Sequence, residues 1–104
     1  MSSVFKALSD PTRRRVLELL REQPLSAGEI AEQFDVSKPT MSAHFAVLKE
    51  ANLVDATKSG KSVIYRIKLS VLEDALLGFA QSFGIGSDPK SADRSESTAK
   101  EDQR

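Results

Sequence analysis

The chain has 104 residues with equal numbers of acidic and basic side chains, a hydrophobic content of 39% and no cysteine. This composition supports one small globular domain, marginal enough for a homo-oligomer to add stability, and it excludes disulfides, thiolate metal sites and thiol redox sensing. No apolar run approaches the roughly 20 residues that span a bilayer, and the start, MSSVFKALSD, does not resemble a signal peptide, so we expect a cytoplasmic protein.

The first third of the chain predicts three short helices. The first covers about residues 3–8, and Asp10 then provides the N-cap of a second helix with Pro11 in its first position. Ser26 and Glu29 have the spacing of a capping box and open a third helix. The expected core positions of these helices are Val4, Phe5, Leu8, Val16, Leu17, Leu19, Leu20, Ile30, Ala31 and Phe34.

After a four-residue break, the stretch VSKPTMSAHFAVLKEANLV, residues 36–54, predicts a fourth helix. Ser37 is its expected N-cap and Pro39 lies in its first turn. Asn52 can end it, because asparagine tolerates the left-handed conformation that helix ends often require. An apolar seam with i, i+4, i+7 spacing is formed by Met41, Phe45 and Leu48.

The remainder predicts a β-hairpin and one more helix. Residues 54–69, VDATKSGKSVIYRIKL, alternate with a period of two on either side of Gly60. Ser70 and Glu73 repeat the capping-box spacing and open a last helix, whose apolar stripe comprises Leu72, Ala75, Leu76, Phe79 and Phe83. Residues 84–104 are polar, so we expect a folded domain at residues 1–83 followed by a disordered tail.

The predicted fold is therefore mainly α with a small β-hairpin, in the order α-α-α-α-β-β-α. Residues 37–68 hold six basic and two acidic side chains, a net charge of +4 that the neutral whole chain conceals. The third and fourth helices, joined by a tight turn, match the helix-turn-helix arrangement that places one helix in a DNA major groove. The small residues Ser42, Ala43 and Ala46 would let this helix approach the bases closely.

We expect the outer side of the fourth helix and the tip of the hairpin to contact DNA. The alternatives are that His44 is an ordinary surface histidine and that the hairpin lysines only protect a strand edge. For Arg13, Arg14 and Arg15 we favour a solvated helix face with partners such as Glu18 over a phosphate clamp. The candidate DNA-binding residues are Ser37, Lys38, Pro39, Thr40, Ser42, Ala43, His44, Lys49, Lys58 and Lys61.

Two segments carry a resemblance to a known family. The segments DPTRRRVLELL and LSAGEIAEQFDVSKPTMSAHFAVLKEANLV resemble the ArsR/SmtB family of winged helix-turn-helix repressors, and VFKALSDPTRR with Ser-Lys-Pro is most similar to its SdpR-like branch. The resemblance implies repression of transcription, possible autorepression or a protein anti-repressor, and a homodimer that reads inverted half-sites of double-stranded DNA. The implied dimer joins the first and last helices through Val4, Phe5, Leu8, Leu72, Leu76, Phe79 and Phe83.

The metal-sensing property of the family does not carry over. The third-helix region reads SAGEIAEQF and the last helix has neither His nor Cys, so we expect no metal site and no cofactor. For Glu73 and Asp74 the alternative to an ordinary surface role is a weak contact with a hard cation. A winged-helix module that binds protein instead of DNA is the alternative function. No nucleophile motif or phosphate loop is present, which argues against an enzyme.

Overall fold

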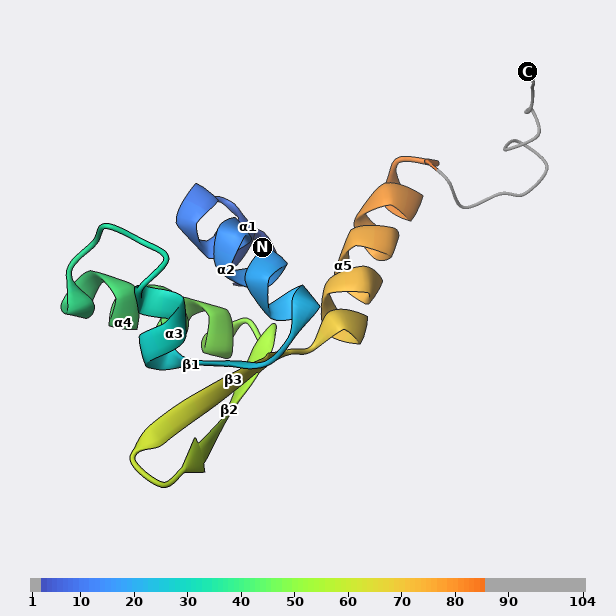
Figure 1. The fold of residues 1–104 in the computed structure, drawn as a ribbon. Coiled ribbons are helices and arrows are strands. Elements are labelled where there is room, and N and C mark those ends of the chain that lie inside the picture. Colours follow the sequence, from blue (N-terminus) through green and yellow to red (C-terminus); the bar gives the residue numbers. More distant parts are fainter. Residues whose placement is uncertain (1–2, 86–104) are drawn as a thin grey trace, which may run out of the picture. The chain divides into compact units, whose positions relative to one another are not determined.

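The computed structural model describes residues 3–85, which form five helices and three strands (Figure 1). The chain divides into two compact units whose boundary in sequence is Leu72, inside the last helix. The prediction of a mainly helical fold with a small antiparallel sheet is confirmed. The elements are α1 (Ser3–Leu8), α2 (Pro11–Glu22), β1 (Leu25–Ser26), α3 (Ala27–Ala31), α4 (Lys38–Glu50), β2 (Val54–Ser59), β3 (Ser62–Ile67) and α5 (Leu69–Ser82).

Helix α2 begins as its sequence predicts. The Asp10 side chain accepts hydrogen bonds from the backbone N–H groups of Thr12 at 2.7 Å and Arg13 at 3.3 Å, and Pro11 occupies the first helical position. Partial desolvation raises the pKa of the Asp10 carboxyl, but these hydrogen bonds and the electrostatic effect of His44 and Arg13 outweigh it. The pKa of Asp10 therefore lies below its usual value.

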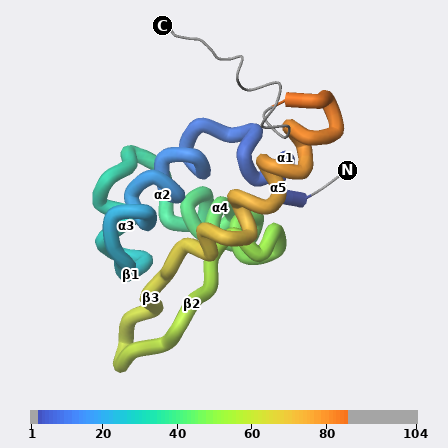
Figure 2. Tube along the Cα trace, turned by 90° about the vertical axis from the view of Figure 1, so that its right-hand side faces the viewer, coloured from blue at the N-terminus to red at the C-terminus, as the bar shows by residue number. Residues whose placement is uncertain are grey.

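The sheet has three strands, not the two of the predicted hairpin. Its order is β1-β3-β2, and the added strand pairs Leu25 with Tyr65 and Ser26 with Ile64. A two-residue strand leaves no periodic signal in a sequence, and only its position beside β3 defines it. In both Figure 1 and Figure 2 the β2–β3 hairpin extends away from helices α1–α4 as a wing.

The hairpin has the register expected from its alternation. Its two-residue turn contains Gly60, whose φ of 60° is accessible to glycine without strain. The inward face pairs Val54 with Ile67 and Ala56 with Tyr65, while Lys58 lies opposite Val63 towards the exposed tip.

The core lies where α1, α2, α3, α4 and the base of the wing meet. Val4 is 6% exposed and is therefore enclosed by its own chain, although it was expected to contact a second copy. Phe5 and Leu8 are half-buried. Fully buried side chains include Val16, Ile30, Met41, Leu48 and Leu53.

Helix α4 has well-defined ends. The Ser37 hydroxyl oxygen accepts the backbone N–H of Thr40 at 3.2 Å, which confirms the predicted N-cap. At the other end, Asn52 has a φ of 61° and Leu53 donates its N–H to the carbonyl of Leu48, as in a Schellman motif. These caps fix α4 between the turn from α3 and the first strand of the wing.

Helix α5 differs from its prediction at its start. It begins at Leu69, so Ser70 lies inside its first turn and the proposed Ser70–Glu73 capping box is wrong. Lys68 lies between β3 and the helix, and its N–H donates to the carbonyl of Leu53 at 2.7 Å. The carbonyl of Lys68 accepts hydrogen bonds from the N–H groups of Val71 and Leu72 in the first turn of the helix. The helix then exposes a row of large apolar side chains. Of the predicted tail, only Gly84 and Ile85 are described, and the remainder lies outside the described residues.

Within residues 3–85, no helix has both the length and the apolar character needed to cross a membrane.

Candidate DNA-binding surface

The exposed side of α4 is built from short side chains with a lysine near each end. Ser42, Ala43 and Ala46 are exposed, and Lys38 and Lys49 are exposed on the same helix. The opposite side packs into the core through the predicted seam, Met41, Phe45 and Leu48. The structure therefore anchors α4 by one face and leaves the other free of bulk, as the sequence predicted.

A hollow lies between α3 and α4, beside the start of α4. Small residues of α3 allow the two helices to approach, and Ser26 with Glu29 caps α3 so that its first turn is fixed. Lys38 and Ser42, both predicted to contact DNA, line this hollow. Its complete lining is Ala27, Gly28, Ala31, Lys38, Met41, Ser42 and Phe45.

A second hollow separates α4 from the wing. It is lined by Ser42, Phe45, Ala46, Lys49 and Tyr65. The rings of Phe45 and Tyr65 stack at 4.6 Å with an interplanar angle of 30°, which attaches the middle of α4 to β3. The alternation of β3 places Tyr65 on the same face of the hairpin as Ala56, and this face meets α4.

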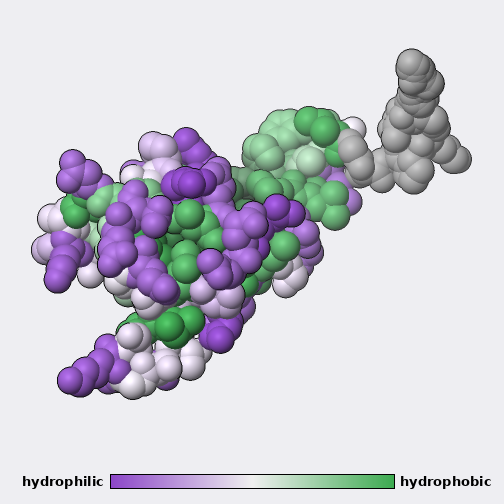
Figure 3. All heavy atoms as spheres, viewed as in Figure 1, coloured by the Kyte–Doolittle hydropathy of each residue, from purple (hydrophilic) through white to green (hydrophobic). Residues whose placement is uncertain are grey.

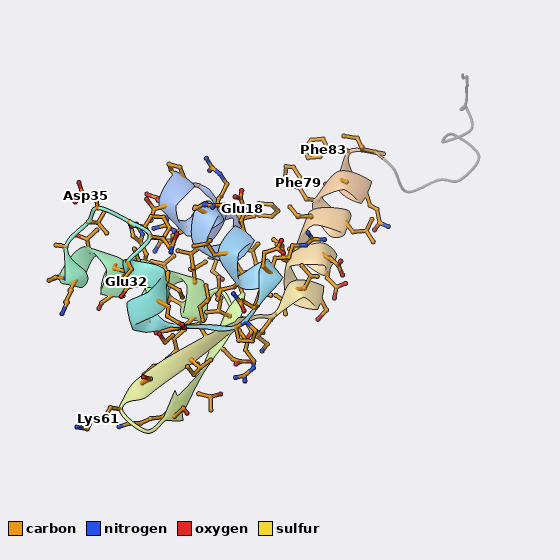
Figure 4. The ribbon with its side chains drawn as sticks, in the orientation of Figure 1. Glu18, Glu32, Asp35, Lys61, Phe79 and Phe83 are labelled. Atoms are coloured by element: carbon orange, nitrogen blue, oxygen red, sulfur yellow. The ribbon has the colours of Figure 1, made fainter. Side chains whose placement is uncertain are left out.

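The wing presents basic side chains at its tip. Lys58 and Lys61 are both exposed, and Figure 4 shows Lys61 at the end of the hairpin, pointing into solvent. The surface there is hydrophilic in Figure 3, in contrast to the apolar base of the hairpin. The candidate DNA-binding residues on α4 and those on the wing thus lie on adjacent elements, with the second hollow between them.

His44 is the exception among the candidate DNA-binding residues. It is half-buried, and its Nδ1 lies 3.2 Å from Nη1 of Arg13 on α2. Because a guanidinium can only donate, Nδ1 acts as the acceptor in this contact. The helical spacing places His44 beside the buried seam rather than with Ser42 and Ala46. Its imidazole therefore contacts α2 through Arg13.

The arginine run is largely intramolecular. Arg15 forms a 3.0 Å ion pair with Glu18, as the solvated-face interpretation predicted. Arg13 and Arg14 instead donate to carbonyl oxygens at the end of α1, those of Lys6, Ala7 and Leu8. Arg13 and Arg14 therefore join α1 to α2, and each of the three arginines has a partner within the chain.

Comparison with known proteins agrees with this geometry. The family described as helix-turn-helix domain matches residues 8–56. The transcriptional repressor SdpR of Bacillus subtilis is 43% identical over 76 residues, which cover 73% of this chain and 84% of that repressor. The arsenical resistance operon repressor of Staphylococcus xylosus is 36% identical, with 70% of each chain covered. The crystal structure of an ArsR family transcriptional regulator superimposes with a TM-score of 0.72 at 29% identity, covering 77% of this chain and 88% of that one.

The chain belongs to the ArsR family. It is a DNA-binding transcriptional repressor with a winged helix-turn-helix fold, and the predicted likeness to the SdpR-like branch is confirmed. Helices α3 and α4 lie within the matched helix-turn-helix region, which ends in β2.

Cysteine and histidine, the side chains expected in a metal-sensing site of this family, are scarce in this protein. It has no cysteine, and its one histidine is hydrogen-bonded to Arg13. Among residues 3–85, no three His, Cys, Asp or Glu side chains gather where they could hold a metal ion. Glu73 and Asp74 are both exposed.

Proposed function

We propose that this repressor binds an inverted-repeat operator as a homodimer, with α4 in the major groove and the wing against the adjoining backbone. The observation that carries the proposal is the exposed α4 face, where Ser42, Ala43 and Ala46 leave room for the edges of base pairs. Lys38 lies at the helix start and Lys58 and Lys61 on the wing, where they can neutralise phosphates. Ser37 and Thr40 occupy the first turn, whose N–H groups favour a phosphate.

The homodimer is supported by the apolar surface of α5. Leu76, Phe79 and Phe83 are 45%, 52% and 66% exposed, and a row of this kind is typical of an interface. The two aromatic rings lie edge to face at 5.1 Å, on the same side of the helix (Figure 4). Phe5, Leu8 and Leu72 are the other residues that we assign to the dimer interface. Two α4 helices would then read half-sites one helical turn, about 34–36 Å, or a multiple of it apart.

The remaining parts of the proposal concern regulation. We infer that the protein represses its own operon, does not respond to metals, has no enzymatic activity and acts in the cytoplasm on the nucleoid. The relatives named above are transcriptional regulators, which supports a regulatory role without catalysis. A protein anti-repressor stays a prediction from the sequence resemblance. No observation favours the alternative of a protein-binding module that does not bind DNA.

A titration of the DNA upstream of the protein's own gene tests this proposal. Wild-type protein should bind it with a log K that falls with log salt by about 0.9 for each phosphate neutralised. Lys38→Ala/Lys61→Ala should bind at least about tenfold more weakly and with a shallower salt slope. Fluorescence anisotropy at several salt concentrations measures both quantities.

Lys6→Ala/Arg21→Ala is the matched control, because it removes the same charge from exposed positions outside the proposed surface. If both double variants lose affinity equally, net charge and not the α4–wing surface determines binding. A flat salt dependence of the wild type would contradict the backbone contacts altogether.

A further inference from the structure

The hydroxyl of Tyr65 is a buried polar group that the fold itself does not use. Tyr65 is 8% exposed and lies in the central strand β3, paired with Leu25 on one side and Ala56 on the other. Its ring stacks on Phe45, but within residues 3–85 its hydroxyl forms no hydrogen bond. Buried hydroxyls are nearly always paired, because leaving one without a partner costs free energy. The Tyr65 hydroxyl thus has no partner among the described residues, which leaves it available to a group that enters the adjoining hollow from solvent.

The Tyr65 side chain lines the hollow between α4 and the wing. Besides Tyr65, the polar residues that line it are Ser42 and Lys49, and the apolar residues are Phe45 and Ala46. Of the residues that the structure describes, no acidic one lines it. One cation and two hydroxyl donors around an open hollow form a set suited to an anion with several acceptor oxygens.

The anion that reaches this hollow follows from the proposed function, on which this inference rests. A helix in the major groove is bounded on each side by a sugar-phosphate backbone. A wing that stands beside the helix and outside the groove must have one of these backbones between itself and the helix. The hollow lies in that gap, since it is lined by α4 on one side and by β3 on the other.

We propose that this hollow is a phosphate subsite that holds one phosphodiester of the operator backbone between Lys49, Ser42 and the hydroxyl of Tyr65. Lys49 supplies the charge, and Tyr65 supplies a donor whose direction is fixed by its strand and by the Phe45 stack. Such contacts set the register of a protein on DNA and carry no base information themselves.

The protonation state of Tyr65 suits this role. Burial raises the pKa of the Tyr65 hydroxyl above its ordinary value, because the phenolate would be poorly solvated. The group therefore remains a neutral donor at neutral and mildly alkaline pH. Because its ring is buried and stacked on Phe45, little side-chain entropy remains to be lost when the phosphate arrives.

The variant Tyr65→Phe tests the assignment in the full-length chain, because it removes the hydroxyl and keeps the stacked ring. Its affinity for the upstream DNA and for an unrelated duplex should fall by the same factor, about tenfold, as expected when a charge-assisted hydrogen bond is removed. Its Tm should stay the same or rise, since the free protein loses a polar group without a partner. A Tyr65 hydroxyl with a structural role would instead give a lower Tm.

Thr57→Val is the matched control. Thr57 is exposed on β2 and points to the other face of the hairpin from Ala56 and Tyr65, so removing its hydroxyl should leave affinity unchanged. Lys49→Met should weaken binding and reduce the salt slope by about 0.9 for each phosphate that the variant no longer neutralises. Tyr65→Phe should leave that slope unchanged, because it removes no charge.

Operator DNA with single uncharged methylphosphonate linkages identifies the phosphate. One position in each half-site should weaken the wild type and have little further effect on Lys49→Met/Tyr65→Phe. If the wild type binds DNA with normal salt dependence while Tyr65→Phe binds equally well, the subsite is wrong and the proposed function stands. If the wild type binds no DNA, the proposed function itself fails. A saturable rise in Tm with inorganic phosphate at constant ionic strength, absent in Lys49→Met, would overturn the backbone assignment in favour of a free anion.

Discussion

At the scale of single residues, Arg13 on α2 connects its own helix to α1 and to α4. Its Nε and Nη2 donate to the carbonyls of Ala7 and Lys6 at 2.8 Å and 3.0 Å, and its Nη1 lies 3.2 Å from Nδ1 of His44. The carbonyls belong to the last turn of α1, where helix hydrogen bonding leaves acceptors unpaired and the dipole favours a cation. One side chain on α2 thus caps α1 and supports α4.

We expect Arg13→Met to destabilise the protein by about 2–3 kcal/mol, because it removes the Arg13 donor from two part-buried acceptors, the Ala7 carbonyl and Nδ1 of His44. Urea unfolding measures the change. Arg15→Met is the control: Arg15 makes one ion pair at the surface, and its removal should cost less than about 1 kcal/mol. Equal destabilisation in the two variants would contradict the prediction that the Arg13 hydrogen bonds stabilise the fold more than a surface ion pair does.

At the scale of the elements, only one of the two Ser-x-x-Glu sequences forms a capping box. In the first, Ser26 accepts the N–H of Glu29 at 3.0 Å while Glu29 Oε1 accepts the N–H of Ser26 at 2.8 Å, so the capping box forms before α3. In the second, Ser70 is already helical, because β3 leads directly into α5 through Lys68. A serine caps a helix only from the position before the first helical residue, where its own backbone is extended, as it is at Ser26.

Ser26→Ala should therefore lower the free energy of unfolding by about 1 kcal/mol, the usual contribution of an N-cap. Ser70→Ala removes the same hydroxyl from an exposed helical position and should change stability by less than about 0.5 kcal/mol. Thermal or urea unfolding distinguishes the two variants. A comparable destabilisation by Ser70→Ala would indicate that Ser70 caps α5 after all, against the structure.

At the scale of the whole molecule, the surface of α5 sets the expected assembly. The helix contains no buried residue, although it is rich in apolar side chains, and its exposed face is apolar in Figure 3. A chain of this size with a small core gains stability by covering such a face with a second copy. The two-fold symmetry of a dimer would then match an inverted-repeat operator.

Leu76→Glu should dissociate the dimer, because it places an unpaired charge in the interface of both copies. The penalty of about 3–5 kcal/mol raises the dissociation constant by at least about 100-fold. Light scattering at micromolar concentration should give twice the 11.4 kDa chain mass for the wild type and one chain mass for the variant.

Gln81→Glu is the control, because it adds the same charge to an exposed position away from the apolar row. It should remain dimeric. A wild-type chain that is monomeric under these conditions would contradict the two-half-site arrangement.

The sequence by itself determined the helices, the hairpin and the anchored face of α4, because caps, turns and apolar periodicity are local signals. Ser37, Gly60 and Asn52 each act on their immediate neighbours, and each has the predicted conformation. The small outer face of α4 was also predictable, since helical spacing alone separates Ser42 and Ala46 from the seam.

Only the tertiary structure decided the partners of single side chains. The direction of His44 depends on Arg13, which is 31 residues away, and β1 exists only because β3 lies beside it. Tyr65 has the pattern of an ordinary strand residue until the sheet brings it against Phe45 and beside Lys49. Contacts between elements depend on how those elements pack together, and that information is not contained in any short stretch of the chain.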